Sequence, residues 1–266
     1  MTTPDLPTAI DPNRPSAARI YDAFLGGTHN FAADRAVAAR AVELVPELPL
    51  IARANRAFLH RAVRYATGRG VRQFLDLGSG IPTERNVHEV ARESDPEARV
   101  VYVDIDPSAV LYARHLLGAD PCIAVVHGDL QHPGPILADR AVRALLDPEE
   151  PTAILMISVL HFVPASPAID QAMVTYREIA RPGSVLALTH ATNSARPQAM
   201  ERVADLYNRT GTALVPRDES QVAGLFEGWR LVDPGLVYGP LWRPDPGEPT
   251  PEDPSKFLTI AAVGER

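Results

Sequence analysis

One strand–turn–helix passage constrains this chain more than any other feature. A mostly apolar run at residues 74–77 leads directly into Gly78-Ser79-Gly80, and Pro82 follows where a helix is expected to begin. In α/β proteins, glycines at such a turn let the backbone approach a nucleotide-like ligand closely. Proline suits the first turn of a helix, because the N–H that it lacks has no partner there. The passage predicts an α/β fold with a ligand site at the turn.

After residue 71, apolar strands and amphipathic helices alternate. We expect strands at 72–77, 99–104, 122–126, 153–159, 184–190, 229–238 and 257–263. We expect helices at 82–93, 107–117, 135–146, 167–180, 195–209 and 218–226. Short connections between such elements are typical of a Rossmann-like, doubly wound, mainly parallel sheet. A proline-rich stretch joins the last two of these strands, and no helix is expected between them. We therefore expect the sheet to end in a hairpin-like, antiparallel pair of strands.

The N-terminal part differs from the rest in its pattern. Residues 1–15 are rich in proline and are expected to form a disordered tail. Residues 16–70 have the apolar spacing of amphipathic helices, interrupted by Gly26-Gly27. We expect a helical lid here, and a main domain at 71–266, within a single structural unit. The alternative is a helix packed on the sheet edge with Tyr21 in the core.

Composition excludes several classes of function. Of the 266 residues, 45% are hydrophobic and 22% are charged, and the net charge of −7 argues against a broad basic face for nucleic acid. No apolar run is long enough to span a membrane, and the proline-rich start is not a secretory signal, so a cytoplasmic location is expected. Cys122 is the only cysteine, and no metal-ligating cluster is apparent. We therefore predict neither a disulfide framework nor a metal site.

The glycine turn fits a ligand without phosphates better than it fits a dinucleotide. A dinucleotide site favours G-x-G-x-x-G, with the pyrophosphate at the helix N-terminus. This chain has Thr83 at the third glycine position, and the next residue, Glu84, would repel a pyrophosphate. Asp76, two residues before Gly78, could hold the loop or receive an ammonium group. S-adenosylmethionine carries an ammonium group and a sulfonium group, and no phosphate.

Further acids follow the next two strands. Asp104 is placed to bind both ribose hydroxyls of such a ligand, and Ile105 to cover a face of the adenine. Asp129, followed by Leu130, is placed to accept a hydrogen bond from the adenine amino group. The carboxyl ends of parallel strands meet at one edge of a sheet, so these residues should lie close together. Asp106 is expected to cap the following helix.

Taken in order, these motifs resemble those of class I S-adenosylmethionine-dependent methyltransferases over about residues 71–190. The motifs that carry the resemblance are Asp76-x-Gly78-x-Gly80, Asp104, Gly128-Asp129, Ser158-Val159-Leu160-His161 and Arg181-Pro182-Gly183. The resemblance implies a seven-stranded sheet in the order 3-2-1-4-5-7-6, with the seventh strand antiparallel. It also implies a cofactor site made of Asp76, Gly78, Ser79, Gly80, Asp104, Ile105, Asp129, Leu130, Ser158 and Val159. Many members carry a third glycine where this chain has Pro82, which leaves the path of the loop open.

The N-terminal segment narrows the resemblance. Residues 16–27 and 30–35 are similar to the N-terminal segment of an actinobacterial subfamily of undefined substrate, and so are residues 82–90. Tyr21 and Asn30 border the Gly26-Gly27 turn, and we expect both to contact the cofactor under a lid formed by residues 16–35. Glycine-flanked segments over a site commonly exclude water and admit substrate.

Methyl transfer depends mainly on positioning, and it needs a general base only if the acceptor arrives protonated. His161, just after the fourth strand, is the expected catalytic residue, and the alternative is a histidine that only packs the loop. His190 is a weaker candidate. The helix at 195–209 and the loop at 240–256 are expected to complete a pocket for a small-molecule acceptor, methylated on oxygen.

The aromatic and basic residues expected in that pocket are Tyr207, Trp242 and Arg243. Exposed aromatics there are equally compatible with a homodimer contact. Nucleic acid is disfavoured as the acceptor, since the segment after the fourth strand lacks the Pro-Pro-aromatic motif of amino-methylating DNA enzymes. Two rival functions stay open: an NAD(P)-dependent oxidoreductase, disfavoured by the glycine spacing, and a non-catalytic S-adenosylmethionine-binding sensor.

Overall fold

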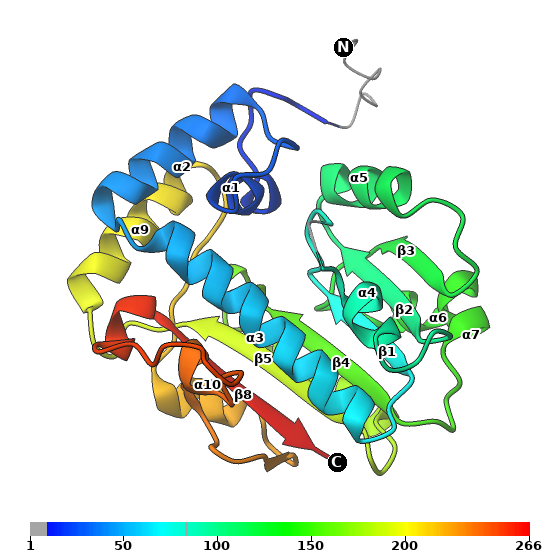
Figure 1. Cartoon of the computed structure of the whole chain (residues 1–266). Coiled ribbons are helices and arrows are strands. Elements are labelled where there is room, and N and C mark those ends of the chain that lie inside the picture. Colours follow the sequence, from blue (N-terminus) through cyan, green and yellow to red (C-terminus); the bar gives the residue numbers. More distant parts are fainter. Residues whose placement is uncertain (1–9, 83–84) are drawn as a thin grey trace.

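The computed structural model describes residues 10–82 and 85–266 and contains one central sheet (Figure 1). Its strands are β1 (Gln73–Leu77), β2 (Arg99–Asp104), β3 (Ile123–His127), β4 (Thr152–Ile157), β5 (Val185–Ala191), β6 (Arg230–Leu231), β7 (Val237–Tyr238) and β8 (Thr259–Glu265). They are arranged in the order β3-β2-β1-β4-β5-β8-β6, and β7 also pairs with β8. The first five strands are parallel, and β8 runs antiparallel to β5. The predicted doubly wound sheet with its antiparallel finish is confirmed.

The end of the sheet differs from the prediction in one detail. The single strand expected at 229–238 is divided into β6 and β7, which both pair with β8. Between them the chain turns at Pro234 and Gly235, where the Gly235 N–H donates to the carbonyl of Val232 at 2.8 Å. Proline cannot donate to a strand ladder, and Gly235 has a φ of +83°, so the strand breaks here.

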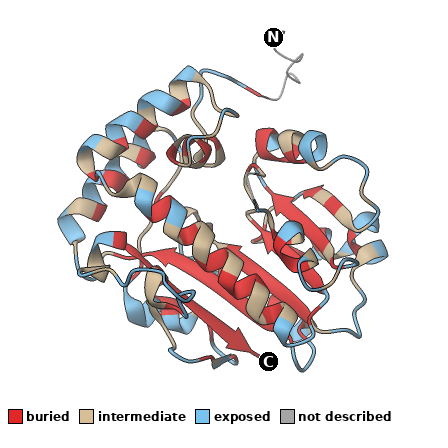
Figure 2. Ribbon diagram, viewed as in Figure 1, coloured by how far each residue is buried: buried red, intermediate tan, exposed pale blue. Residues whose placement is uncertain are grey.

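Helices cover both faces of the sheet because the parallel strands are apolar on both faces. On one face lie α3 (Leu48–Gly68), α4 (Val87–Arg92) and α5 (Pro107–Leu117), and on the other α6 (Pro133–Ala138), α7 (Arg140–Leu145), α8 (Pro167–Ile179) and α10 (Glu219–Gly224). Neighbouring residues of β1 show the division: Phe74 packs in the cluster with α3, and Leu75 packs in the cluster with α8. Figure 2 shows the resulting burial of the strands.

Two predicted helices have different bounds. The helix expected at 135–146 is two short helices, because Asp139 ends α6 and its side chain caps α7 by accepting from the Ala141 N–H at 2.7 Å. The helix expected from residue 82 begins at Val87, and Thr83 and Glu84 lie outside the described residues. In the described part of the chain, no helix is both long and apolar enough to span a membrane.

The segment 16–70 expected to form a helical lid does not form one layer, because its last helix, α3, packs on the sheet. The part before α3, here called the lid, forms a layer beyond the carboxyl ends of the strands (Figure 1). It consists of α1 (Ala17–Phe24) and α2 (Ala32–Leu44), which share an apolar cluster with α9 (Pro197–Arg209). Ile20 of α1, Ala41 of α2 and Val203 of α9 are among the buried members of this cluster. Of the predicted tail, residues 1–9 lie outside the described part, and Ile10 is buried.

The loop after β7 includes the short helices η2 (Gly239–Leu241) and η3 (Pro254–Phe257) and folds back onto α3. Trp242 is buried there, with its ring edge-on to Phe58 at 5.3 Å and to Tyr65 at 5.9 Å. Arg61 of α3 donates to the carbonyl of Trp242 at 2.8 Å, and Arg243 lies over the Tyr65 ring. The expectation that the loop at 240–256 completes the acceptor pocket is therefore wrong.

Candidate functional site

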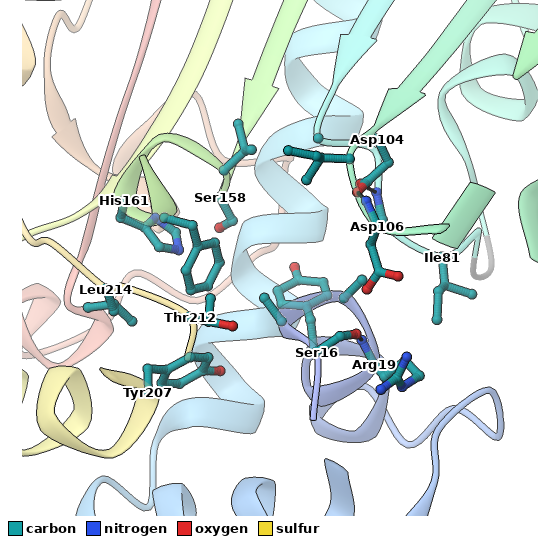
Figure 3. A pocket seen from close by; sticks show the side chains of 18 of the residues that line it. Ser16, Arg19, Ile81, Asp104, Asp106, Ser158, His161, Tyr207, Thr212 and Leu214 are labelled. Carbon is teal, nitrogen blue, oxygen red and sulfur yellow. Dashed lines mark hydrogen bonds between the residues drawn. The ribbon is translucent and has the colours of Figure 1, made fainter. Parts of the chain in front are cut away.

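A cavity of about 810 Å³ lies at the carboxyl ends of β1, β2, β3 and β4 and extends beneath the lid and α9 (Figure 3). This volume is within the range of roughly 300–1,000 Å³ that is usual for small-molecule sites. The predicted cofactor residues other than Asn30 line it, and so does His161, whereas His190, Trp242 and Arg243 do not. The lining residues among those predicted are Tyr21, Asp76, Gly78, Ser79, Gly80, Asp104, Ile105, Asp129, Leu130, Ser158, Val159 and His161. The fold brings together residues that are far apart in the sequence.

The glycine loop is fixed against β2 and leaves its far side open. The N–H groups of Gly78 and Ser79 both donate to the carbonyl of Val103, at 2.8 and 3.1 Å. Gly78 has a φ of +75°, and a Cβ atom on it would lie 2.2 Å from a methyl carbon of Val159. Gly80 has a φ of +66°, and a Cβ atom there would meet no atom within 4 Å. Gly78 is required for packing, whereas Gly80 keeps the backbone accessible to a ligand.

Asp104 ends β2 with its carboxylate turned toward the glycine loop. One carboxylate oxygen accepts from the Gly80 N–H at 2.7 Å, and the other from the Asp106 N–H at 2.8 Å. Burial raises the pKa of Asp104 to about 6, although these hydrogen bonds act in the opposite direction. Each oxygen keeps a lone pair for a ribose hydroxyl. Asp106 caps α5 by accepting from the Ser108 N–H at 2.7 Å, which confirms the predicted cap.

Asp76 is a buried carboxylate at the end of β1. Burial raises its pKa to about 7, while the charge of Arg56 lowers it and the charge of Asp104 raises it further. Among the described residues, none donates a hydrogen bond to the Asp76 carboxylate. An ionised carboxylate without donors is unfavourable in such a place, so a cationic group of a ligand would be stabilised there.

Asp129, Leu130 and Ile105 complete the part of the cavity beside the glycine loop, where they provide one polar and two apolar side chains. Asp129 accepts from the Gln131 N–H at 2.9 Å, and Leu130 is buried, with its carbonyl bonded to the Tyr176 hydroxyl at 2.9 Å. Ile105 is 60% exposed, although it lines the cavity. The exposed apolar side chain of Ile105, which lines the cavity together with Asp104 and Asp129, is suited to packing against one face of a planar ring.

Tyr21 belongs to a hydrogen-bond chain that joins the lid to the sheet. Its hydroxyl donates to the Ala52 carbonyl at 3.0 Å and accepts from the Asn55 amide at 3.0 Å. The Thr189 hydroxyl donates to Asn55 at 2.7 Å and accepts from the Ser158 N–H at 2.8 Å. The Tyr21 hydroxyl is therefore occupied within the protein. The sequence reasoning missed Asn55 and Thr189, although a polar residue in an apolar helix stripe or strand was the available signal.

Asn30 does not line the cavity. Its amide donates to the Asp22 carboxylate at 2.7 Å and to the Gly27 carbonyl at 2.9 Å. A Cβ atom on Gly27 would lie 2.0 Å from the Asp22 carboxylate, so the turn needs glycine at this position. The structure places Asn30 in the framework of the lid.

Arg19 lines the cavity and connects the lid to the start of α5 (Figure 3). It is buried, forms an ion pair with Asp34 at 2.8 Å and donates to the Ser108 hydroxyl at 2.9 Å. The Ser108 hydroxyl in turn donates to the Asp106 carboxylate at 2.5 Å. Nothing in the sequence pattern distinguishes Arg19 from the many surface arginines. These contacts hold α1 of the lid against the start of α5.

His161, on η1 (Leu160–Phe162), lines the cavity and is buried. Burial, and then the neighbouring His190 and Arg217, hold its pKa well below the usual 6.5, so the ring is neutral at neutral pH. His190 does not line the cavity, and both of its ring nitrogens are bonded, to the Ala191 carbonyl at 2.7 Å and to Arg217 at 2.6 Å. His190 therefore belongs to the framework.

The far half of the cavity is mostly apolar, as Figure 3 shows around Tyr207 and Leu214. It is lined by residues from α1, η1, α9 and the segment 211–214: Phe24, Phe162, Met200, Val203, Tyr207, Thr212 and Leu214. Residues of the helix expected at 195–209 line the cavity, and their contact with an acceptor stays a prediction. Residues 211–214 were missed, because no pattern in a turn of this length indicates which way it faces.

Comparison with known proteins shows which family this chain belongs to. A family model described as S-adenosyl methyltransferase matches residues 4–266. A proposed methyltransferase from Thermobifida fusca YX is 40% identical, with a TM-score of 0.91 and 99% of each chain covered. A DUF574 family protein from Streptomyces avermitilis MA-4680 is 35% identical, with a TM-score of 0.91, covering 96% of this chain and 99% of that one. No functionally curated protein matches the sequence significantly.

A more distant structure shares the fold alone. Human N-acetylserotonin methyltransferase, solved with S-adenosylmethionine, is 13% identical, with a TM-score of 0.50, covering 94% of this chain and 60% of that one. The site itself fits the same donor, because Asp76 and Asp104 offer buried carboxylates to an ammonium group and to hydroxyls, beside the exposed side chain of Ile105. The chain belongs to the S-adenosyl methyltransferase family, and S-adenosylmethionine is its methyl donor.

Proposed function

We propose that this methyltransferase acts on an oxygen atom of a small organic molecule, which binds in the α9 half of the cavity. The observation that carries the proposal is the continuity of the cavity from the glycine loop to the apolar half under the lid. A donor bound at the loop and an acceptor bound beneath α9 would share one water-poor space. Positioning of this kind supplies most of the rate in a simple displacement.

The donor half suggests a role for each of its residues. Asp76 would receive the ammonium group, Asp104 the ribose hydroxyls, and Asp129 the adenine amino group. The backbone of Gly78, Ser79 and Gly80 would lie along the methionine end, with Ser158 and Val159 opposite, and Ile105 and Leu130 would enclose the adenine. Tyr21 would contribute its ring, because its hydroxyl already bonds to Ala52 and Asn55. S-adenosylmethionine supplies a methyl group activated by the sulfonium charge.

The lid favours a small acceptor over a polymer. Arg19, which lines the cavity, joins α1 of the lid to Ser108 of α5 at 2.9 Å. The net charge of −7 also disfavours a nucleic acid, whose binding would require neutralisation of its phosphates. An acceptor that fits under such a lid is a metabolite rather than a strand of DNA or RNA.

Transfer of labelled methyl groups from S-adenosylmethionine tests this proposal. The enzyme is incubated with an extract of a Streptomyces culture, which is then separated by ultrafiltration. We expect the label in small molecules of the filtrate, and an Asp104→Ala variant should give none. Label retained mainly in nucleic acid or protein would contradict the proposal.

A further inference from the structure

Two polar groups on the wall of the acceptor half, the part of the cavity lined by η1, α9 and residues 211–214, have a proton that no described residue accepts: the Tyr207 hydroxyl and the His161 ring. Tyr207 on α9 is 5% exposed, and among the described residues its hydroxyl forms no hydrogen bond. Burial raises the pKa of Tyr207 far above 10, so the hydroxyl keeps its proton. Figure 3 shows this hydroxyl turned into the cavity. A hydroxyl that faces the cavity and has no acceptor in the described protein is available to donate to a ligand atom.

His161 presents a second donor to the same space. The Ala191 N–H donates to its Nδ1 atom at 3.4 Å, and a backbone N–H can only donate. Because the ring is neutral, Nδ1 carries no proton and Nε2 must carry one. In the described part of the chain, the Nε2–H group has no acceptor. His161 in this tautomer gives a hydrogen bond to the ligand and cannot remove a proton from it at Nε2.

A buried cation lies beside His161. The Arg217 guanidinium donates to the carbonyls of Leu160 and Val163, at 2.8 and 3.0 Å, and to His190. It forms no ion pair with any described residue, and Asp170 favours its charge only from a distance. Those carbonyls flank His161 along the chain. An uncompensated buried charge makes the potential positive in the adjoining cavity.

Acidic side chains gather at the opposite end of the cavity. Asp76, Asp104 and Asp129 line the donor half, whereas none of the described lining residues from η1, α9 or 211–214 is acidic. The acceptor half thus contains hydrogen-bond donors and a nearby cation, but no carboxylate that could act as a general base. An acceptor that must lose a proton would find no group there to take it.

We infer that the acceptor is a small organic acid that is methylated on its carboxylate oxygen. This inference rests on the proposed function and specifies its substrate class. A carboxylate is already ionised at neutral pH, so no base is needed. One carboxylate oxygen forms the new bond to the methyl carbon as the carbon–sulfur bond breaks, and sulfur keeps that electron pair. The products are a methyl ester and S-adenosylhomocysteine.

The surrounding side chains indicate an apolar or aromatic body for this acid. The Phe162 ring lies 5.6 Å from the Tyr207 ring and 4.4 Å from the His161 ring. Met200, Val203 and Leu214 complete the wall around them. A planar apolar skeleton would pack against these rings, while its carboxylate takes the two donors.

Calorimetric binding to the enzyme saturated with S-adenosylhomocysteine tests the inference. The probes are benzoate, phenylacetate and 3-phenylpropionate, each compared with its neutral amide. We expect at least one acid to bind roughly tenfold or more tightly than its amide, since hydrogen bonds to a charged group are the stronger ones. Preference for the amides, or no binding by any of the acids, would overturn the inference.

Variants connect that preference to the two donors. Tyr207→Phe and His161→Phe should each weaken the binding of the acid roughly tenfold and leave the binding of the amide within about twofold. His161→Gln keeps an N–H donor and should retain most of the affinity. Tyr238→Phe is the matched control, because it removes a tyrosine hydroxyl from β7, outside the cavity, and should change nothing. Equal losses for acid and amide would contradict the assignment.

The chemistry of the product separates the inference from the proposed function. Labelled small molecules from the extract are treated with mild alkali, which releases methanol from methyl esters but not from ethers or N-methyl groups. Release of the label supports the inference. Alkali-stable label in a methyl ether would overturn the inference while the proposed function stands. Label in an N-methyl group, or absence of any labelled small molecule, would contradict the proposed function as well.

Discussion

The two halves of the cavity differ in the elements that form them and in the side chains that line them. The donor half is formed by the ends of adjacent parallel strands and carries the carboxylates Asp76, Asp104 and Asp129. The acceptor half is formed by α1, η1, α9 and the segment 211–214, and it carries apolar walls with the Tyr207 and His161 donors. The first suits a cation that bears hydroxyls, and the second suits an apolar anion. Opposite electrostatic characters at the two ends would orient two oppositely charged reactants toward each other.

The largest expected effect is in the donor half. Asp104→Ala removes the carboxylate proposed to hold both ribose hydroxyls, and hydrogen bonds to a charged group contribute roughly 1.5–3 kcal/mol each. We expect the affinity for S-adenosylhomocysteine, measured by calorimetry, to fall by roughly a hundredfold or more. Circular dichroism should show a folded protein. Unchanged affinity would show that Asp104 does not hold the ribose.

The glycine loop should be the next most sensitive feature. A Cβ atom at Gly78 would lie 2.2 Å from Val159, at a φ of +75° that disfavours other residues. We expect Gly78→Ala to lower the free energy of unfolding by roughly 1–3 kcal/mol and to weaken donor binding. Chemical denaturation measures the first effect. Adding Val159→Ala should restore part of the stability by relieving the clash, and no recovery would show that backbone conformation dominates.

The pH dependence of donor binding should distinguish the two halves as well. Burial raises the pKa of Asp76 to about 7 in the empty protein, and an ammonium group binds the ionised form. Affinity for S-adenosylhomocysteine should therefore increase roughly tenfold or more between about pH 5.5 and 7. Asp76→Asn should remove most of this increase and leave the smaller part that comes from Asp104, whose pKa burial raises to about 6. The raised pKa of Asp76 also makes the empty protein lose stability as the pH rises from about 4 to about 7. A flat affinity profile in the unmodified enzyme would contradict the role of Asp76.

The smallest effect is expected at Tyr21, where the lid meets the donor half. Its hydroxyl bonds only within the protein, to Ala52 and Asn55. We expect Tyr21→Phe to reduce stability by about 1 kcal/mol and to change donor affinity less than threefold, whereas Tyr21→Ala should weaken binding more. A large loss of affinity in Tyr21→Phe, measured by calorimetry, would mean that the hydroxyl contacts the ligand.

The same contrast explains what could be predicted from the sequence. The donor half could be predicted because the order of the strands brings its residues together. Leu77 pairs with Val103 in neighbouring parallel strands, so the loop after Leu77 must lie beside Asp104. Residue types at strand ends were therefore sufficient to place it. The helices of the lid could also be predicted from their apolar periodicity. The hydrogen bond from Arg19 to Ser108, which joins the lid to α5, could not.

The acceptor half could be predicted only in part, because its residues meet through tertiary packing alone. His161 and Tyr207 come from segments that no strand register relates, and Thr212 lies in an irregular turn. The error at Trp242 has the same origin, since a proline-rich loop gives no sign of which surface it will cover. The role of a buried polar residue such as Asn55 becomes clear only when its hydrogen-bond partners are known.

A crystal structure of the enzyme with S-adenosylhomocysteine would test the division of the cavity most directly. We expect the ribose on Asp104, the adenine between Ile105 and Leu130, and the amino group on Asp76, with the space beside Tyr207 and His161 left free for the acceptor. Adenosine bound beneath α9, against Tyr207, would contradict this expectation.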